Sequence, residues 1–298
     1  MNLGLMHPWQ GFKNPRLMDP WQGVWRLPRV AVVLVFLLLA GCERSGKTVV
    51  RLSGSSTIAP VAAELADAWR DRTDLPALLV ESGGSGKGLV DLAGGHAEIA
   101  MVSRRLAPDE QTGRIALPIA RDRIVVIVHR DNPLSKLTAD ALRGIYVGRI
   151  RNWDQLVSGF KMPIVVVEKA AGRGTHVAFH RALALDEDAV RADAIVGANA
   201  EVIDAVGRSR GAIGYVSAST LSGARGSSVA VRALPLSADL KERLSRPLLL
   251  VARRPLTPAV HSVLRAFCAA EAVTHLTRWG FDPDPRCRDR IPPMAMKH

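Results

Sequence analysis

The sequence predicts an α/β fold with two lobes, each a mostly parallel sheet flanked by helices. The chain has 298 residues, of which 48% are hydrophobic, so it is long enough to bury two cores. Aromatic residues make up only 5%, which favours alternating strands and helices over an aromatic-rich β-sandwich. Short β-type runs alternate with helical patterns along the chain, and this alternation is typical of parallel sheets covered on both faces.

The first 41 residues predict an export signal rather than part of the fold. Two arginines precede an unbroken apolar run, residues 30–40, which is too short to span a bilayer as a permanent helix. The run ends in Leu-Ala-Gly-Cys, which resembles the bacterial lipobox, where the cysteine is acylated. We therefore expect a signal peptide over 1–41 and a lipid anchor at Cys42, on the periplasmic side of a bacterial membrane. The alternatives are an uncleaved anchor and an ordinary buried cysteine.

The chain after the leader begins with a repeated strand, Gly-rich loop and helix. Strands are expected at residues 49–52, 78–80 and 98–102. The first is followed by apolar residues at Val61, Leu65 and Trp69, a spacing that gives a helix one apolar face. Residues 124–128, Ile-Val-Val-Ile-Val, are the strongest pattern of a buried strand.

A second α/β set begins after the Asn132-Pro133 pair. Later strands are expected at 164–167, 212–216 and 247–251, followed by one long helix over 258–279. We expect two lobes joined by strands near Val126 and Leu249, with a ligand cleft between the lobes. The expected boundaries are 48–127 plus 228–285 for lobe 1, 128–227 for lobe 2 and 286–298 for a C-terminal tail.

The formal net charge of +12 favours anionic partners. The leader carries +3 of this charge, and much of the remaining excess is arginine spread singly along the chain. No Lys/Arg run is interleaved with aromatic residues, as a groove for single-stranded nucleic acid would require. We therefore expect the partner to be a small anion and not a nucleic acid. We also expect a monomer without a cofactor.

Three loops share one design, in which a strand leads through a Gly/Ser/Thr-rich turn into a helix. They are residues 54–57, 83–88 and 172–175. Such a loop presents backbone N–H groups and hydroxyls at the positive end of a helix, which suits an anion. A single loop of this kind is usually only an N-cap, but three loops from both halves of the chain indicate a shared anion site. The loop 83–88 lacks the spacing of a Walker A motif and of a dinucleotide-binding fingerprint.

Seven blocks of sequence, in order along the chain, resemble the phosphate-binding proteins of bacterial phosphate ABC transporters. The most distinctive are Ile-Tyr-Val-Gly-Arg-Ile-Arg-Asn-Trp at 145–153 and Gly-Ala-Ile-Gly-Tyr-Val at 211–216. The other blocks are residues 54–60, 82–88, 98–104, 132–134 and 172–175. The resemblance implies a type-II periplasmic binding protein fold that holds dehydrated phosphate between its lobes and presents it to the permease subunits of a transporter.

By position, the resemblance also implies which residues bind the ligand. They are Ser56, Thr57 and Ile58 in the first loop, Ser85 in the second, Ser103 and Arg104 after the third strand, and Lys169, Arg173, Gly174 and Thr175 in the lobe-two loop.

Two departures from the family pattern concern the ligand. The lobe-two pattern Arg-x-x-Gly-Ser-Gly-Thr has Lys169 in place of Arg and Arg173 in place of Ser, and lysine lacks the planar guanidinium fork. Arg173 either supplies a guanidinium from a new position or blocks the site. Some family members carry Asp where Ser103 stands, as an acceptor for the proton of phosphate. Without that carboxylate, the choice between phosphate and sulfate stays open.

The remaining cysteines and histidines have simpler interpretations. Cys268 and Cys287 are expected to pair in an oxidising periplasm. Neither has a second Cys or His at metal-ligand spacing. His176 and His180 are one helical turn apart but lack the Glu of the H-E-x-x-H metal motif, so we interpret them as a partly exposed helical pair and predict no metal site.

These observations predict an extracytoplasmic, lipid-anchored binding protein, not an enzyme, that delivers phosphate or a similar oxyanion to an ABC transporter. The alternative is an anion-sensing or scaffold lipoprotein with the same fold and no transport role, which the altered lobe-two loop motivates. A hydrolase of phosphate esters is a third hypothesis, for which the sequence has no matched nucleophile and base.

Overall fold

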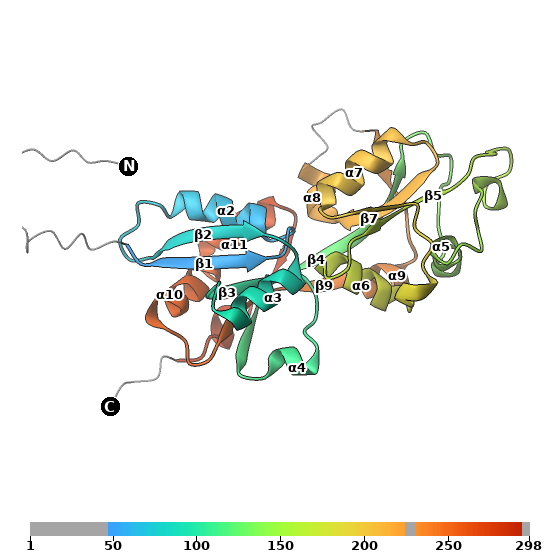
Figure 1. The fold of residues 1–298 in the computed structure, drawn as a ribbon. Coiled ribbons are helices and arrows are strands. Elements are labelled where there is room, and N and C mark those ends of the chain that lie inside the picture. Colours follow the sequence, from blue (N-terminus) through green and yellow to red (C-terminus); the bar gives the residue numbers. More distant parts are fainter. Residues whose placement is uncertain (1–46, 224–229, 294–298) are drawn as a thin grey trace, which may run out of the picture. The chain divides into compact units, whose positions relative to one another are not determined.

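The computed structural model of the protein describes residues 47–223 and 230–293 (Figure 1). The predicted signal peptide and Cys42 lie outside the described residues. Among the helices of the described part, none has the length and apolar character needed to cross a membrane.

Strands and helices alternate along the described chain, as predicted. The strands are β1 Val49–Gly54, β2 Ala77–Ser82, β3 Ile99–Val102, β4 Arg114–His129, β5 Val165–Lys169, β6 Ala194–Val196, β7 Ala212–Ser217, β8 Val231–Ala233, β9 Ser245–Arg253 and β10 Asp282–Pro283. The α-helices are α2 Ala59–Ala68, α3 Ser85–Gly94, α4 Pro108–Gln111, α5 Ala139–Tyr146, α6 Gly174–Leu183, α7 Asn199–Arg208, α8 Ala218–Gly223, α9 Ala238–Arg243, α10 Pro258–Phe267 and α11 Ala270–Arg278.

The strands form a sheet in the order β2-β1-β3-β9-β4-β7-β5-β6, with β8 and β10 added on β4. One half is built around β1, which is parallel to β2 and β3, and the other around β5, which is parallel to β6 and β7. Between them, β9 and β4 are antiparallel to their neighbours and run side by side. This arrangement confirms the predicted α/β class, with three successive parallel strands in each half.

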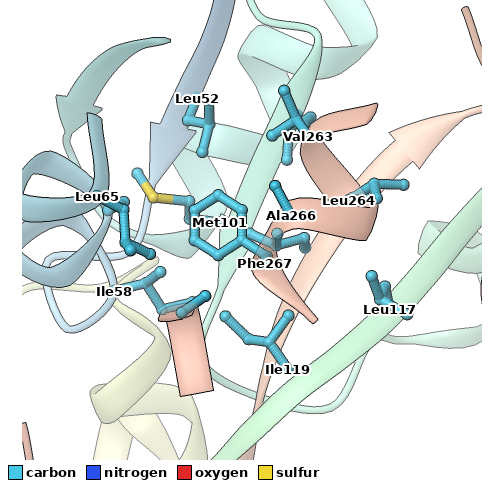
Figure 2. Packing of buried hydrophobic residues seen from close by; sticks show 14 of the residues in the cluster. Leu52, Ile58, Leu65, Met101, Leu117, Ile119, Val263, Leu264, Ala266 and Phe267 are labelled. Carbon is cyan, nitrogen blue, oxygen red and sulfur yellow. The ribbon is translucent and has the colours of Figure 1, made fainter. Parts of the chain in front are cut away.

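The first core gathers apolar side chains of β1, α2, β3, β4, β9, α10 and α11. Figure 2 shows Leu52, Ile58, Met101 and Phe267 packed together in it. The second core lies around β4, α5, β5, α6 and β7, with Tyr146 and Phe179 among its largest members. Smaller clusters cover the opposite face of each half-sheet, so the central strands are buried on both sides.

The predicted boundary between the lobes is wrong for residues 230–244. Strand β8 pairs with β4 at Ile127–Ala233, and Leu240 and Leu244 are buried in the second core. The segment joins the second core because its leucines have their apolar neighbours there rather than beside β1. The passage between the cores therefore lies near Asp122 in β4 and Ser245 at the start of β9, a few residues before the predicted positions.

The long helix predicted over 258–279 is two helices, α10 and α11. Between them Ala269 has φ −82° and ψ 159°, an extended conformation that ends the hydrogen-bond ladder. The preceding residue, Cys268, forms a disulfide with Cys287, with the Cα atoms 5.5 Å apart. Cys287 is 4% exposed and belongs to the first core, so the predicted tail is tied into the fold at this residue.

Candidate anion-binding site

Strands β1, β2 and β5 each lead through a Gly-rich loop into a helix. Gly54 ends β1 with φ +132°, and a Cβ added to it would lie 2.4 Å from the carbonyl oxygen of Met101, so only glycine fits there. Its own carbonyl accepts a hydrogen bond of 2.7 Å from the N–H of Gly84. The first two predicted loops and the end of β3 are therefore packed directly against each other.

The lobe-two loop lies against these residues. Gly174 begins α6, and a Cβ added to it would lie 2.4 Å from Oγ of Ser85 and 2.5 Å from Oγ of Ser103. Oγ of Ser85 accepts a hydrogen bond of 3.1 Å from the N–H of Ser103. The N–H of Gly86 donates to the carbonyl oxygen of Gly172 at 3.0 Å. The three predicted loops meet at one place.

Arg246, at the start of β9, lies at the centre of this meeting point. Its Nη1 donates to Oγ1 of Thr175 at 2.9 Å and to Oγ of Ser103 at 3.2 Å. Its Nη2 donates to Oγ1 of Thr57 at 3.0 Å. The residue is only 2% exposed, so one buried guanidinium joins hydroxyls from both halves of the fold.

The charge of Arg246 is balanced by Asp122, which lies directly opposite it in the register of β4 and β9. Oδ2 of Asp122 accepts from Nη2 at 2.7 Å and from Nε at 3.1 Å. Oδ1 accepts from the hydroxyl of Ser217 at 2.9 Å. Both carboxylate oxygens are therefore engaged within the protein.

Sequence analysis missed both members of this ion pair. The local signal for this pair is weak, because neither residue is a single charge inside an apolar run. Arg246 precedes the apolar run Pro-Leu-Leu-Leu-Val, and Asp122 lies between Arg121 and Arg123 in strand β4. The neighbours of the two residues in sequence therefore do not mark either of them as buried.

Lys169 lies at the edge of the cluster and is 1% exposed. Its Nζ donates to Oδ1 of Asn199 at 3.1 Å, and Nδ2 of Asn199 lies 3.4 Å from Oγ1 of Thr57. Burial, together with the positive charges of Arg246 and Arg173, lowers the pKa of Lys169 to about 7. The lysine therefore holds its proton only weakly in the absence of an anion.

Three predicted residues lie outside the cluster. Arg104 is directed to Glu110, with hydrogen bonds of 2.6 and 2.7 Å to the carboxylate. The side chain of Ile58 is in the first core, and its N–H donates to the carbonyl oxygen of Ser55 at 3.1 Å. Ser56 is half-buried and has no side-chain hydrogen bond among the described residues.

Arg173 also lies apart from the hydroxyl groups. A Cβ added to Gly84 would be 2.9 Å from Cδ of Arg173, and one added to Gly197 would be 2.8 Å from its Nη2. Its guanidinium thus lies near the start of α7. The pKa of Glu201 is lowered mainly by hydrogen bonds from the backbone N–H groups of Gly197 and Ala198, and the charge of Arg173 lowers it by a smaller amount. The guanidinium among the hydroxyls belongs to Arg246 and not to Arg173.

The expectation that His176 and His180 are partly exposed is wrong. They are 4% and 6% exposed, because this face of α6 packs towards β5 and the second core. Nε2 of His180 lies 3.3 Å from Oε2 of Glu168, which comes from β5. The acidic partner that the helix lacks in sequence is supplied by the preceding strand.

Comparison with known proteins identifies relatives of this architecture. The family model of the PBP superfamily domain matches residues 43–250. Protein SphX of Synechococcus elongatus is 29% identical over 209 residues, which cover 63% of this chain. That alignment spans 61% of SphX, less than two thirds of its length.

Two solved structures share the fold over most of their length. A phosphate ABC transporter substrate-binding protein from Clostridium perfringens, with bound phosphate, is 27% identical; the match has a TM-score of 0.72 and covers 80% of this chain and 100% of that one. An ABC-type phosphate transport receptor from Vibrio cholerae is 28% identical, with a TM-score of 0.64, over 78% of this chain and 99% of that one.

Proposed function

The chain belongs to the PBP superfamily, and we propose that it is a solute-binding protein whose ligand is inorganic phosphate or a similar oxyanion. The ligand would be held where the three loops meet. The bound phosphate of the Clostridium perfringens relative supports this choice of ligand.

The buried guanidinium of Arg246 is the observation that carries the proposal. Around it stand the hydroxyls of Thr57, Ser103 and Thr175, with Ser85 beside them. Guanidinium and hydroxyl groups donate hydrogen bonds, and both suit the oxygens of a tetrahedral anion. Asp122 accepts from Nε and Nη2 of Arg246 and so keeps the guanidinium oriented, with Nη1 turned to the hydroxyls of Ser103 and Thr175.

The position of the donors supports a capture mechanism. Thr57 and Ser85 come from the first half of the fold, and Thr175 and Asn199 come from the second. An anion bound by donors from both halves favours the conformation in which they are together, since binding shifts the population towards the state with more contacts. A transporter that recognises this conformation would receive only loaded protein.

The proposal extends to cellular context. We infer that the protein is exported through the leader 1–41 and acylated at Cys42. We also infer that it is a monomer without enzymatic activity, and that it delivers the anion to the permease of an ABC transporter. Changing Cys42 to Ala should release the protein from the membrane fraction, and incorporation of radiolabelled palmitate should be lost with it.

Calorimetric titration of the purified protein, first dialysed free of bound anion, tests the ligand. Phosphate should bind with one site per chain, with a smaller or comparable heat for sulfate. Binding of neither anion would contradict the proposal and favour the sensor or scaffold alternative.

A further inference from the structure

Behind the anion site lies a second buried cluster, formed by Glu168, His176 and His180. Glu168 comes from the end of β5, and the two histidines lie one turn apart on α6. The three residues are 4%, 4% and 6% exposed. The proposed anion contacts do not include any of them.

The geometry of the cluster is that of a set of metal ligands. One ligand atom from each residue lies within 4.8 Å of those from the other two. Nε2 of His180 and Oε2 of Glu168 are 3.3 Å apart. Two ligands held about 2.0–2.1 Å from a tetrahedral zinc ion are separated by about 3.3 Å, so this pair is already at coordination spacing.

The histidines also have hydrogen-bonding capacity that the protein does not use. The Nδ1 atoms of both His176 and His180 are buried without a hydrogen-bond partner among the described residues. A buried polar atom without a partner is costly. The two imidazole rings lie 4.0 Å apart between centroids, with 34° between their planes.

We propose that Glu168, His176 and His180 bind a divalent transition metal ion, with zinc as the best fit. Two imidazoles and one carboxylate are a set that zinc uses, whereas magnesium and calcium prefer six or more oxygen ligands. Histidines at i and i+4 on one helical face are a common way to present two such ligands. Oε1 of Glu187 lies 3.7 Å from Nδ1 of His176, which is beyond hydrogen-bond distance.

A metal here would join β5 to α6 across the lobe-two loop. Glu168 precedes Lys169, and His176 follows Thr175, so each side of the metal site is bonded directly to a residue of the anion site. Fixing the loop before the anion arrives would reduce the conformational entropy lost on binding. The proposed metal therefore has a structural role that preorganises the loop.

The test uses the tag-free full-length protein, stripped with a chelator and held in phosphate-free buffer. Titration with Co²⁺ should produce visible absorption bands of a tetrahedral site at one ion per chain, and Zn²⁺ should displace them. Because no anion is present, failure of this experiment is distinct from failure of the phosphate proposal.

Matched variants locate the site. His176→Gln should weaken Co²⁺ binding by more than about tenfold, since loss of even a second-shell partner costs about that much. The control is His275→Gln, because Nδ1 of His275 also contacts a carboxylate, Oε1 of Glu64 at 2.8 Å, without a second histidine. Equal binding by the two variants, or no cobalt spectrum in the wild-type protein, would overturn the proposal. If His176→Gln does not fold, the wild-type stoichiometry and spectrum decide.

Discussion

Arg246 and Asp122 form an ion pair across two adjacent strands, with Nη2 and Oδ2 2.7 Å apart and both residues 2% exposed. They face each other in the register of β9 and β4, at the point where the chain passes from one core to the other. The same guanidinium contacts hydroxyls on loops from both halves. One pair therefore connects the packing of the fold with the candidate site.

Replacing Asp122 by Asn should lower the free energy of unfolding by about 3 kcal/mol or more, because a buried guanidinium would be left without its counter-charge. Urea denaturation of the anion-free protein measures this loss. The control is Glu242→Gln, whose carboxylate pairs with Arg121 at 3.5 Å on an exposed surface and should change stability little. Equal urea midpoints for the two variants would show that the buried ion pair contributes no more to stability than the exposed pair.

Replacing Arg246 by Lys should weaken phosphate binding roughly 10- to 100-fold. Lysine keeps the charge but cannot reach Thr57, Ser103 and Thr175 at once, and a hydrogen bond to a charged group contributes about 1.5–3 kcal/mol. The same change at Arg51, an exposed residue of β1, is the control and should leave the affinity unaltered. An unchanged affinity for Arg246→Lys would remove this residue from the site.

The wild-type protein should bind sulfate within about tenfold of phosphate. The carboxylate of Asp122 is engaged by Arg246 and Ser217, so the cluster has no free carboxylate among the described residues to accept the proton of phosphate. Replacing Ser103 by Asp should lower sulfate affinity far more than phosphate affinity. Competition calorimetry measures the ratio, and strong exclusion of sulfate by the wild-type protein would contradict this prediction.

Replacing Gly174 by Ala should reduce phosphate affinity by roughly tenfold or more. The added methyl would lie 2.4 Å from Oγ of Ser85 and 2.5 Å from Oγ of Ser103, so the hydroxyls must move or the loop must withdraw. Alanine is a better helix former than glycine, so its helix propensity alone would stabilise α6 and not destabilise it. The control is Gly223→Ala, because a Cβ added to Gly223 meets no atom of the described residues within 4 Å. Titration of both variants under the same conditions decides the matter.

Replacing both Cys268 and Cys287 by Ser should lower the free energy of unfolding by about 3 kcal/mol. The disulfide closes a chain segment with a sequence separation of 19, and such a cross-link stabilises chiefly by limiting the unfolded ensemble. Thermal unfolding with and without a reducing agent measures the effect. If reduction leaves the unfolding temperature unchanged, the bond makes no contribution to stability.

The sequence by itself determined the α/β alternation and the three loops at the ends of β1, β2 and β5. These features depend on short segments, such as Gly54 to Thr57, whose residue types restrict the backbone locally. The same reasoning could not locate the break at Ala269, because residues 268–269 contain neither glycine nor proline and the apolar spacing continues across them.

Only the tertiary structure decided which charges meet. Arg246 and Asp122 are 124 residues apart, and their contact depends on the register of β9 against β4. The burial of His176 beside Glu168 likewise depends on how α6 packs against β5. Local patterns record the conformation of a segment, whereas the partners of a buried charge are chosen by the packing of distant segments, where desolvation penalises every unpaired arrangement.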